Sequence, residues 1–113
     1  MVLDVYFFRL ESGREPVREW LKSLDMDAKK SIGEDIRTIQ GRWPLGMPLV
    51  RKMESNLWEV RANIKEGISR IFFTVESHHM ILLHGFVKKT NKTPKSEIAL
   101  ARKRMKEWRK NNE

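Results

Sequence analysis

A chain of 113 residues, 40% hydrophobic and 34% charged, has the size and composition of one globular domain with a single modest core. It has no cysteine, which excludes disulfides and thiolate metal sites, and no apolar run is long enough to span a membrane. No signal-peptide pattern precedes the first predicted strand. We therefore expect a single domain over residues 1–113, without a membrane partner, in the cytoplasm.

The net charge of +8 is concentrated towards the C-terminus. Residues 1–87 hold 13 Lys and Arg against 12 Asp and Glu, whereas residues 88–113 hold 10 against 3. Such asymmetry is typical of proteins that bind a polyanion. A basic helix that only keeps the protein in solution is the alternative, but the cations adjoin a predicted sheet face with two arginines, which favours nucleic acid.

The first half of the chain predicts one strand and two helices. Residues 2–8 form a strand with apolar residues on both phases, which indicates partial cover on both faces. Ser12 and Glu15 fit a capping box, with Pro16 in the first helical turn, and Asp25 is the expected N-cap of the second helix. The two helices are expected to form an antiparallel hairpin laid on a sheet. Their apolar stripes are Val17, Trp20, Leu21 and Leu24, then Ala28, Ile32, Ile36, Ile39 and Trp43.

The second half predicts four strands and a basic helix. Alternating apolar residues place strands over 49–54, 57–64, 69–75 and 81–90. Thr93 as N-cap and Pro94 as the first residue open a C-terminal helix, with a buried stripe of Ile98, Ala101, Met105 and Trp108. The order β-α-α-β-β-β-β-α indicates an α+β fold. We expect a mainly antiparallel, twisted sheet covered by the helical hairpin and by the basic helix.

Four side chains that could bind or transform a phosphate share one phase of the strands. If the strands pair as neighbours, Arg61, Arg70, His84 and Lys88 lie on one face and a continuous apolar layer lies on the other. Two guanidinium groups on adjacent strands could clamp a phosphodiester and stabilise the charge that builds when it is attacked. The alternative is that Arg61 pairs with Glu59 or Glu76 and only stabilises the surface.

Other basic residues could extend this site. Lys88 and Lys89 point to opposite faces while the strand continues, so the phase favours Lys88, and Lys89 joins only if the strand ends earlier. Lys52 could enter from the preceding strand or be solvated. The basic segment that follows suits docking on RNA phosphates. Its candidate RNA-binding residues, with Lys52, are Lys92, Lys95 and Arg102.

Histidine is the side chain best suited to proton transfer near neutral pH, and His84 has the phase of the arginines. Leu82 and Phe86 flank it, so a histidine hydrogen-bonded inside an apolar patch is an equal alternative. His78 and His79 are adjacent in a predicted turn. Because adjacent side chains on an extended chain diverge, we expect no metal site.

The chain lacks a nucleophile elbow, a phosphate-cradling glycine loop and a paired-carboxylate motif. The remaining chemistry needs only cations and a proton shuttle. RNA supplies its own nucleophile, the 2′-hydroxyl, so a protein that aligns it with the neighbouring phosphate can cut RNA without a cofactor. The products would be a 2′,3′-cyclic phosphate, or the 3′-phosphate formed by its hydrolysis, and a 5′-hydroxyl.

Several segments together resemble the HigB branch of the RelE/ParE toxin superfamily, of the phage-derived, host-killing type. The segments are LWEVR (57–61), GISRIFF (67–73), LLHGFVKKTNKTP (82–94) and EIALA (97–101). The resemblance covers nearly the whole chain, and HGFVKKTNKTP is its most specific part. It implies a RelE-like fold, the toxin role in a type II toxin–antitoxin pair, and cleavage of messenger RNA in the ribosomal A site.

The resemblance also implies a partner and roles for residues. The partner is a cognate HigA-like antitoxin, usually with a helix-turn-helix DNA-binding domain, in a hetero-oligomeric complex. Arg61, Arg70 and the pair Lys88 and Lys89 are the implied RNA-contacting and catalytic set. Some RelE-type enzymes use a tyrosine near the C-terminus as base. Since this chain has no tyrosine after Tyr6, Lys88, Lys89 and His84 are the candidates for that role.

The sequence is also compatible with two other functions. A ParE-like protein would have the same fold and would inhibit DNA gyrase by binding it, with no chemistry. A non-catalytic nucleic-acid-binding module would use the basic helix, but it would also need exposed aromatic side chains for stacking.

Overall fold

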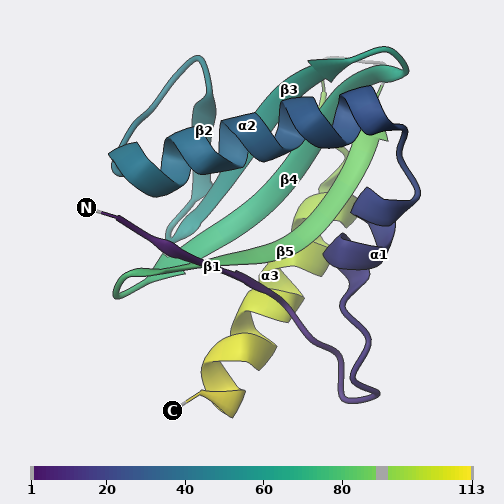
Figure 1. Cartoon of the computed structure of the whole chain (residues 1–113). Helices are drawn as coiled ribbons and strands as arrows, with labels where there is room; N and C mark the ends of the chain where they lie inside the picture. The colour runs from purple at the N-terminus through teal and green to yellow at the C-terminus, as the bar shows by residue number, and fades with distance from the viewer. Residues whose placement is uncertain (1, 89–91, 113) are drawn as a thin grey trace.

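The computed structural model describes residues 2–88 and 92–112, which form an α+β fold of five strands and three helices (Figure 1). The elements follow the predicted order. They are β1 (Asp4–Phe7), α1 (Pro16–Lys22), α2 (Met26–Arg42), β2 (Val50–Glu54), β3 (Leu57–Ile64), β4 (Gly67–Glu76), β5 (His79–Lys88) and α3 (Lys95–Asn111). Within the described ranges, no helix is both long and apolar enough to cross a membrane.

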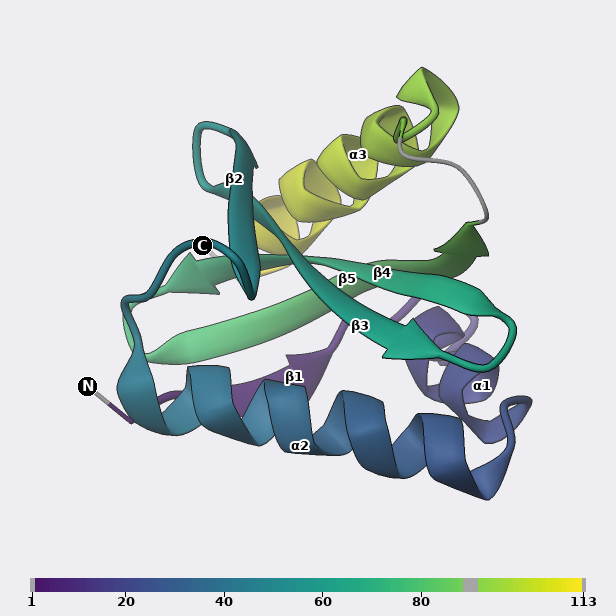
Figure 2. The same ribbon diagram turned by 90° about the horizontal axis from the view of Figure 1, so that it is seen from above.

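The sheet has the strand order β1-β5-β4-β3-β2 and is mixed. Strands β2 to β5 form the predicted antiparallel meander. The N-terminal strand β1 joins the far edge in parallel with β5, to which it is not connected by a short turn. Seen from above, α1 and α2 lie on one side of the sheet and α3 on the other (Figure 2).

The first face of the sheet carries the larger apolar cluster. Its buried members include Ile32 and Ile39 of α2 against Val60 and Phe73 of the sheet, so the predicted stripe of α2 faces the core. The two helices share this face, but each packs mainly against strands, α1 on β5 and β1 and α2 on β3, so they form a looser pair than the predicted hairpin.

Trp20 of α1 rests directly on the backbone of Gly85 in β5. A Cβ atom added to Gly85 would lie 2.5 Å from the six-membered ring of Trp20, closer than non-bonded atoms can approach. Glycine at this position therefore permits the close contact between α1 and β5.

The second face is covered by α3, so the sheet is apolar on both sides over much of its area. Ala101 and Met105 of α3 are buried against Leu57, Phe72 and Leu83 of three strands, as the predicted stripe requires. This corrects the expectation that one face would be apolar and the other basic. Strand β4 shows the consequence: every residue from 69 to 74 is buried, because β4 lies at the centre of the sheet with helices on both sides.

The predicted cap of α2 is present, because the carboxylate of Asp25 accepts a hydrogen bond from the backbone N–H of Ala28 at 2.8 Å. The predicted capping box of α1 is wrong. The helix starts at Pro16 with Glu15 as N-cap and no side-chain cap, and Ser12 lies too far ahead of it.

The predicted cap of α3 is also displaced by one residue. Pro94 is the N-cap, with the extended backbone that its ring favours, and Lys95 is the first helical residue. The hydroxyl of Thr93 is therefore not used by the helix and is turned towards the sheet.

Candidate functional site

The strand register gathers the predicted residues on the face that α3 covers in part. Arg61 of β3 lies directly opposite Arg70 of β4, and Arg70 lies opposite Phe86 of β5. His84 and Lys88 are two residues to either side of Phe86, so they project from the same face. The predicted grouping of Arg61, Arg70, His84 and Lys88 is confirmed as a shared face.

Arg70 is nevertheless enclosed. Its side chain is 0% exposed, and its Nη1 donates to Oε1 of Glu59 at 2.6 Å, where Glu59 is also 0% exposed. Among the residues that the structure describes, no partner is present for Nε and Nη2 of Arg70. A buried charge of this kind is kept by its counter-charge, so Arg70 is part of the interior and not an open phosphate clamp.

The other carboxylate oxygen of Glu59 continues the contact towards the end of β5. Thr93 donates its hydroxyl to Oε2 of Glu59 at 3.1 Å, and the ammonium of Lys88 donates to the same hydroxyl oxygen at 3.2 Å. A chain of polar contacts thus runs from Arg70 through Glu59 and Thr93 to Lys88, and we name these four residues the buried network. It ties the segment before α3 to three strands of the sheet.

Arg70 and Glu59 of the buried network are fully enclosed, Lys88 has 6% of its surface exposed, and Thr93 is half-buried. Burial lowers the pKa of Lys88, and the neighbouring charge of Arg70 lowers it further, whereas Glu59 acts in the opposite direction. A lysine with a lowered pKa has a larger neutral fraction at a given pH, and its neutral amine can accept a proton.

Two further arginines share a face of the sheet with Lys88. The register turns Arg61 of β3 and Arg51 of β2 to this face, and their charges help to lower the pKa of Lys88. Arg61 is half-buried and Arg51 is exposed, and neither makes a side-chain hydrogen bond or ion pair with another described residue. They are the accessible cations of the site. The alternative for Arg61, a pair with Glu59 or Glu76, is not observed, because Glu59 binds Arg70 and Glu76 binds Arg109.

Arg51 occupies the place that Lys52 would have in a regular hairpin. The short turn after β2 would place Lys52 opposite Glu59, but the register shifts between Lys52 and Glu54. The observed pairs are Arg51 with Glu59 and Lys52 with Trp58. Because a shift of one residue reverses the faces, the irregularity turns Arg51 towards the site and Lys52 to the side of α1 and α2. Of the two alternatives for Lys52, the register excludes an approach to the site and favours a solvated lysine.

His84 does not join the buried network and instead contacts α3 and two aromatic rings. Its Nε2 is hydrogen-bonded to the carboxylate of Glu97 in α3, and its ring stacks on the rings of Phe72 and Phe86. Arg104 of α3 approaches the other ring nitrogen at 3.5 Å and donates to the backbone oxygen of Leu83 at 2.9 Å. Of the two interpretations from sequence, these contacts favour the histidine held inside an aromatic patch, which helps to dock α3.

Some basic side chains of α3 are held in ion pairs with the sheet, so its composition overstates how many are available to bind RNA. Arg102 forms two hydrogen bonds to the carboxylate of Glu54, at 2.7 and 2.8 Å, and Arg109 binds Glu76 at 2.7 Å. Among the other predicted RNA-binding residues, Lys92 and Lys95 are exposed at the start of the helix. Lys89 lies outside the described residues.

Sequence reasoning missed the residues that complete the site. The sequence pattern predicts Glu59 only as a surface partner of Arg61 and Thr93 only as a cap, and it assigns no site role to Arg51, Glu97 or Arg104. Glu59 shares the phase of Arg61, so its place on the same face could have been found from the alternation alone. Arg51 and Arg61 thus lie on the same face as Lys88, whose pKa is lowered, and this arrangement can bind a phosphate and move a proton.

Comparison with known proteins adds the family. Residues 19–106 match the family of phage-derived Gp49-like proteins (DUF891), and this range includes every residue of the buried network as well as Arg51 and Arg61. No match to a curated protein was found. The family is toxin-like and related to the RelE toxins, in agreement with the resemblance of the sequence. The match covers most of the chain, and the protein therefore belongs to the family of phage-derived Gp49-like proteins.

Proposed function

We propose that this protein is the toxin of a type II toxin–antitoxin pair, a HigB-like endoribonuclease that cleaves messenger RNA in the ribosomal A site. The toxin-like family and the α+β fold support the class. The observation that carries the chemistry is Lys88: a nearly buried amine of lowered pKa, held by Thr93 on the same face as Arg61 and Arg51.

In this mechanism Lys88 is the general base. Its neutral amine takes the proton from the 2′-hydroxyl, the 2′-oxygen attacks the adjacent phosphorus, and the bond to the 5′-oxygen breaks. The departing 5′-oxygen is protonated from water, and the ammonium of Lys88 returns its proton to solvent. Arg61 and Arg51 bind the non-bridging oxygens and stabilise the extra negative charge of the transition state. The products are a 2′,3′-cyclic phosphate and a 5′-hydroxyl.

The buried members of the network have a positioning role in this proposal. Arg70 orients Glu59, and Glu59 and Thr93 hold Lys88 in place. Arg70, which the resemblance implies to be catalytic, does not touch the substrate here because its side chain is fully enclosed. Lys89 remains a second candidate base by its position in the sequence.

The partners follow from the same proposal. Exposed lysines of the C-terminal segment, such as Lys95, Lys103, Lys106 and Lys110, would contact ribosomal RNA phosphates, a contact that weakens with salt. A HigA-like antitoxin with a helix-turn-helix domain would neutralise the toxin in a hetero-oligomeric complex in the cytoplasm. The stacking module considered above has less support, because Phe72 is buried and Phe86 is half-buried against His84.

The test is a reconstituted translation reaction in which message 5′ ends are mapped by primer extension, with and without ribosomes. We expect cuts within codons only when ribosomes are present, and a loss of about 100-fold or more in rate for Lys88→Met. Lys30→Ala, on the exposed side of α2, is the matched control and should cut like the wild type. Intact message together with inhibited gyrase supercoiling would replace this proposal with the ParE-like function. Cutting of free RNA would show that cleavage does not require the ribosome.

A further inference from the structure

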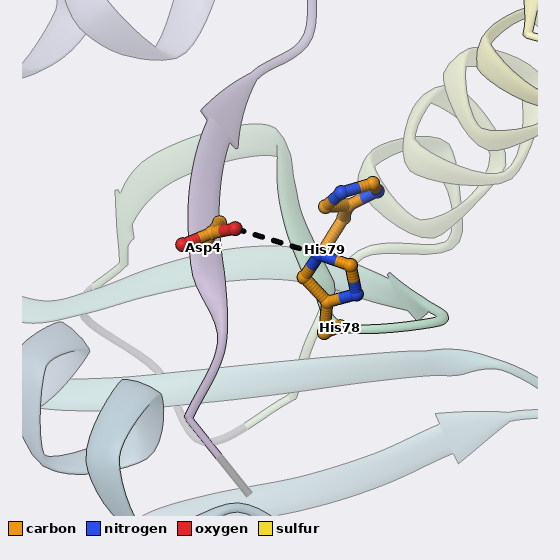
Figure 3. Close-up of side chains that lie close together, drawn as sticks. All are labelled: Asp4, His78 and His79. Carbon is orange, nitrogen blue, oxygen red and sulfur yellow. Dashed lines mark ion pairs between the residues drawn. The ribbon is translucent and has the colours of Figure 1, made fainter.

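The opposite end of β5 from Lys88 brings together an aspartate and two histidines (Figure 3). The parallel register pairs Asp4 of β1 with His79, the first residue of β5. The backbone N–H of Asp4 donates to the backbone oxygen of His78 at 2.8 Å. These backbone contacts hold β1 against the turn between β4 and β5, so the three side chains are brought together by the fold.

The side chains have the spacing of a loosely assembled metal site. One ligand atom from each of Asp4, His78 and His79 can be chosen so that all three lie within 4.8 Å of one another. Nε2 of His78 lies 3.6 Å from Oδ2 of Asp4. Ligand atoms around a tetrahedral zinc ion are roughly 3.4 Å apart. Small rotations of the exposed side chains of Asp4 and His78 would close this difference.

The sequence-based expectation that the two histidines diverge is wrong. Their ring centroids are 4.3 Å apart. The reason is the turn: Ser77 has a φ of +58°, in the left-handed region, so His78 is not part of an extended chain and its ring comes beside that of His79.

Neighbouring groups orient both rings. The hydroxyl of Ser77 lies 3.3 Å from Nδ1 of His78, which leaves Nε2 directed at Asp4. The ring of Tyr6 packs edge-on against His79, with centroids 4.9 Å apart. Contacts that fix the second ring nitrogen or the plane of an imidazole are typical of histidines that ligate metals.

We propose that Asp4, His78 and His79 bind one divalent transition-metal ion of the zinc class through one oxygen and two nitrogens, with water completing the coordination. Imidazole favours zinc, nickel and copper ions over calcium and magnesium, which prefer oxygen ligands. β5 has 10 residues, so the site lies about 30 Å from Lys88 along the strand. The ion would fasten β1 to the β4–β5 turn and stabilise the fold, apart from the proposed cleavage.

The experiment is calorimetric titration of ZnCl₂ into full-length protein that carries no histidine tag and has been treated with a chelator. We expect one site per chain and a melting temperature that rises with zinc concentration. The double variant His78→Gln/His79→Gln should lose this binding, and Asp4→Asn should weaken it about tenfold. Asp27→Asn removes an exposed carboxylate from α2 and is the matched control, with unchanged binding.

A second measurement locates the ion in the wild-type protein and does not depend on any variant folding. Zinc should shift the ring-proton NMR signals of His78 and His79 and leave those of His84 in place. Wild-type protein that shows no saturable binding up to about millimolar zinc, or a double variant that binds like the wild type, would overturn the proposal. In that case the contact would be an ordinary ion pair between Asp4 and His78.

Discussion

Nη1 of Arg70 and Oε1 of Glu59 are 2.6 Å apart, and no part of either side chain is exposed to solvent. Removing one partner leaves the other charge buried without compensation, which costs about 3–5 kcal/mol. We expect Arg70→Ala and Glu59→Ala each to lower the free energy of unfolding by this order, measured by urea denaturation. Loss of toxicity in Arg70→Ala would therefore report a loss of stability.

The double variant Arg70→Met/Glu59→Met separates the charge from the packing. It removes both charges and keeps two side chains of similar length, so it should be more stable than either single alanine variant. If either single alanine variant unfolds at the same urea concentration as the wild type, the buried pair does not contribute to the free energy of unfolding as expected.

The lowered pKa of Lys88 predicts the direction of a pH dependence. Because the pKa of the ordinary lysine is 10.5 and that of folded Lys88 is lower, the folded state holds fewer protons on this group than the unfolded state. The cost of burying the charge is present at neutral pH and is relieved as the pH rises through the folded pKa towards 10.5. The stability of the wild type relative to Lys88→Met should thus increase with pH. Urea denaturation of both proteins at a series of pH values measures it, and parallel curves would contradict it.

The same group predicts the pH dependence of cleavage. If the neutral amine of Lys88 is the base, the single-turnover rate should rise with pH and level off below the ordinary lysine value of 10.5. Lys88→Arg keeps a positive charge but cannot lose its proton at these pH values, so the rise should disappear with the activity. A Lys88→Arg variant with the wild-type profile would assign the base to another group.

Arg51 and Lys52 provide an internal comparison on one strand. Arg51→Ala removes an accessible cation on the same face as Lys88 and should weaken substrate binding by about tenfold. Lys52→Ala removes the same charge from the opposite face and should bind like the wild type. Binding of an uncleavable RNA with a 2′-deoxy residue at the cut site, on ribosomes, measures both. Equal losses would show that net charge, and not the face, determines binding.

The contact between Trp20 and Gly85 predicts a cost that depends on both residues. Gly85→Ala should lower stability by about 1–3 kcal/mol, because its Cβ would overlap the indole ring. In Trp20→Leu the same glycine substitution should cost much less. Thermal unfolding of the two single variants and the double variant measures the coupling, and additive losses would argue against the contact.

The fold was largely predictable because its signals are local. Period-2 alternation identified the strands, the apolar stripes identified the helices, and the shared phase of Arg61 and Arg70 placed them on one face. The burial of Arg70 was not predictable in this way. It depends on α3 packing over that face and on Glu59 remaining free to bind it, and both are tertiary contacts between distant parts of the chain.

The presence of Arg51, and not Lys52, on the face of the site has a different cause. One extra residue in β2 reverses the faces of the residues before it, and the sequence around Met53 carries no glycine that would signal an irregularity. The approach of His78 to His79 likewise depends on one backbone angle at Ser77. Single-residue changes of register or turn therefore decide which polar side chains meet, even where the elements themselves are predicted well.

The pairing of β1 with β5 also determines how late in synthesis the sheet can be completed. β1 is the first strand to leave the ribosome, but among the described strands it pairs only with β5, the last one made. Lys88 ends β5 and Thr93 follows it, so the buried network cannot form until most of the chain has been translated. Nascent chains interrupted before this point have Glu59 and Arg70 but lack the residues that complete the network, so the ribosome translates most of the message before the fold can be completed.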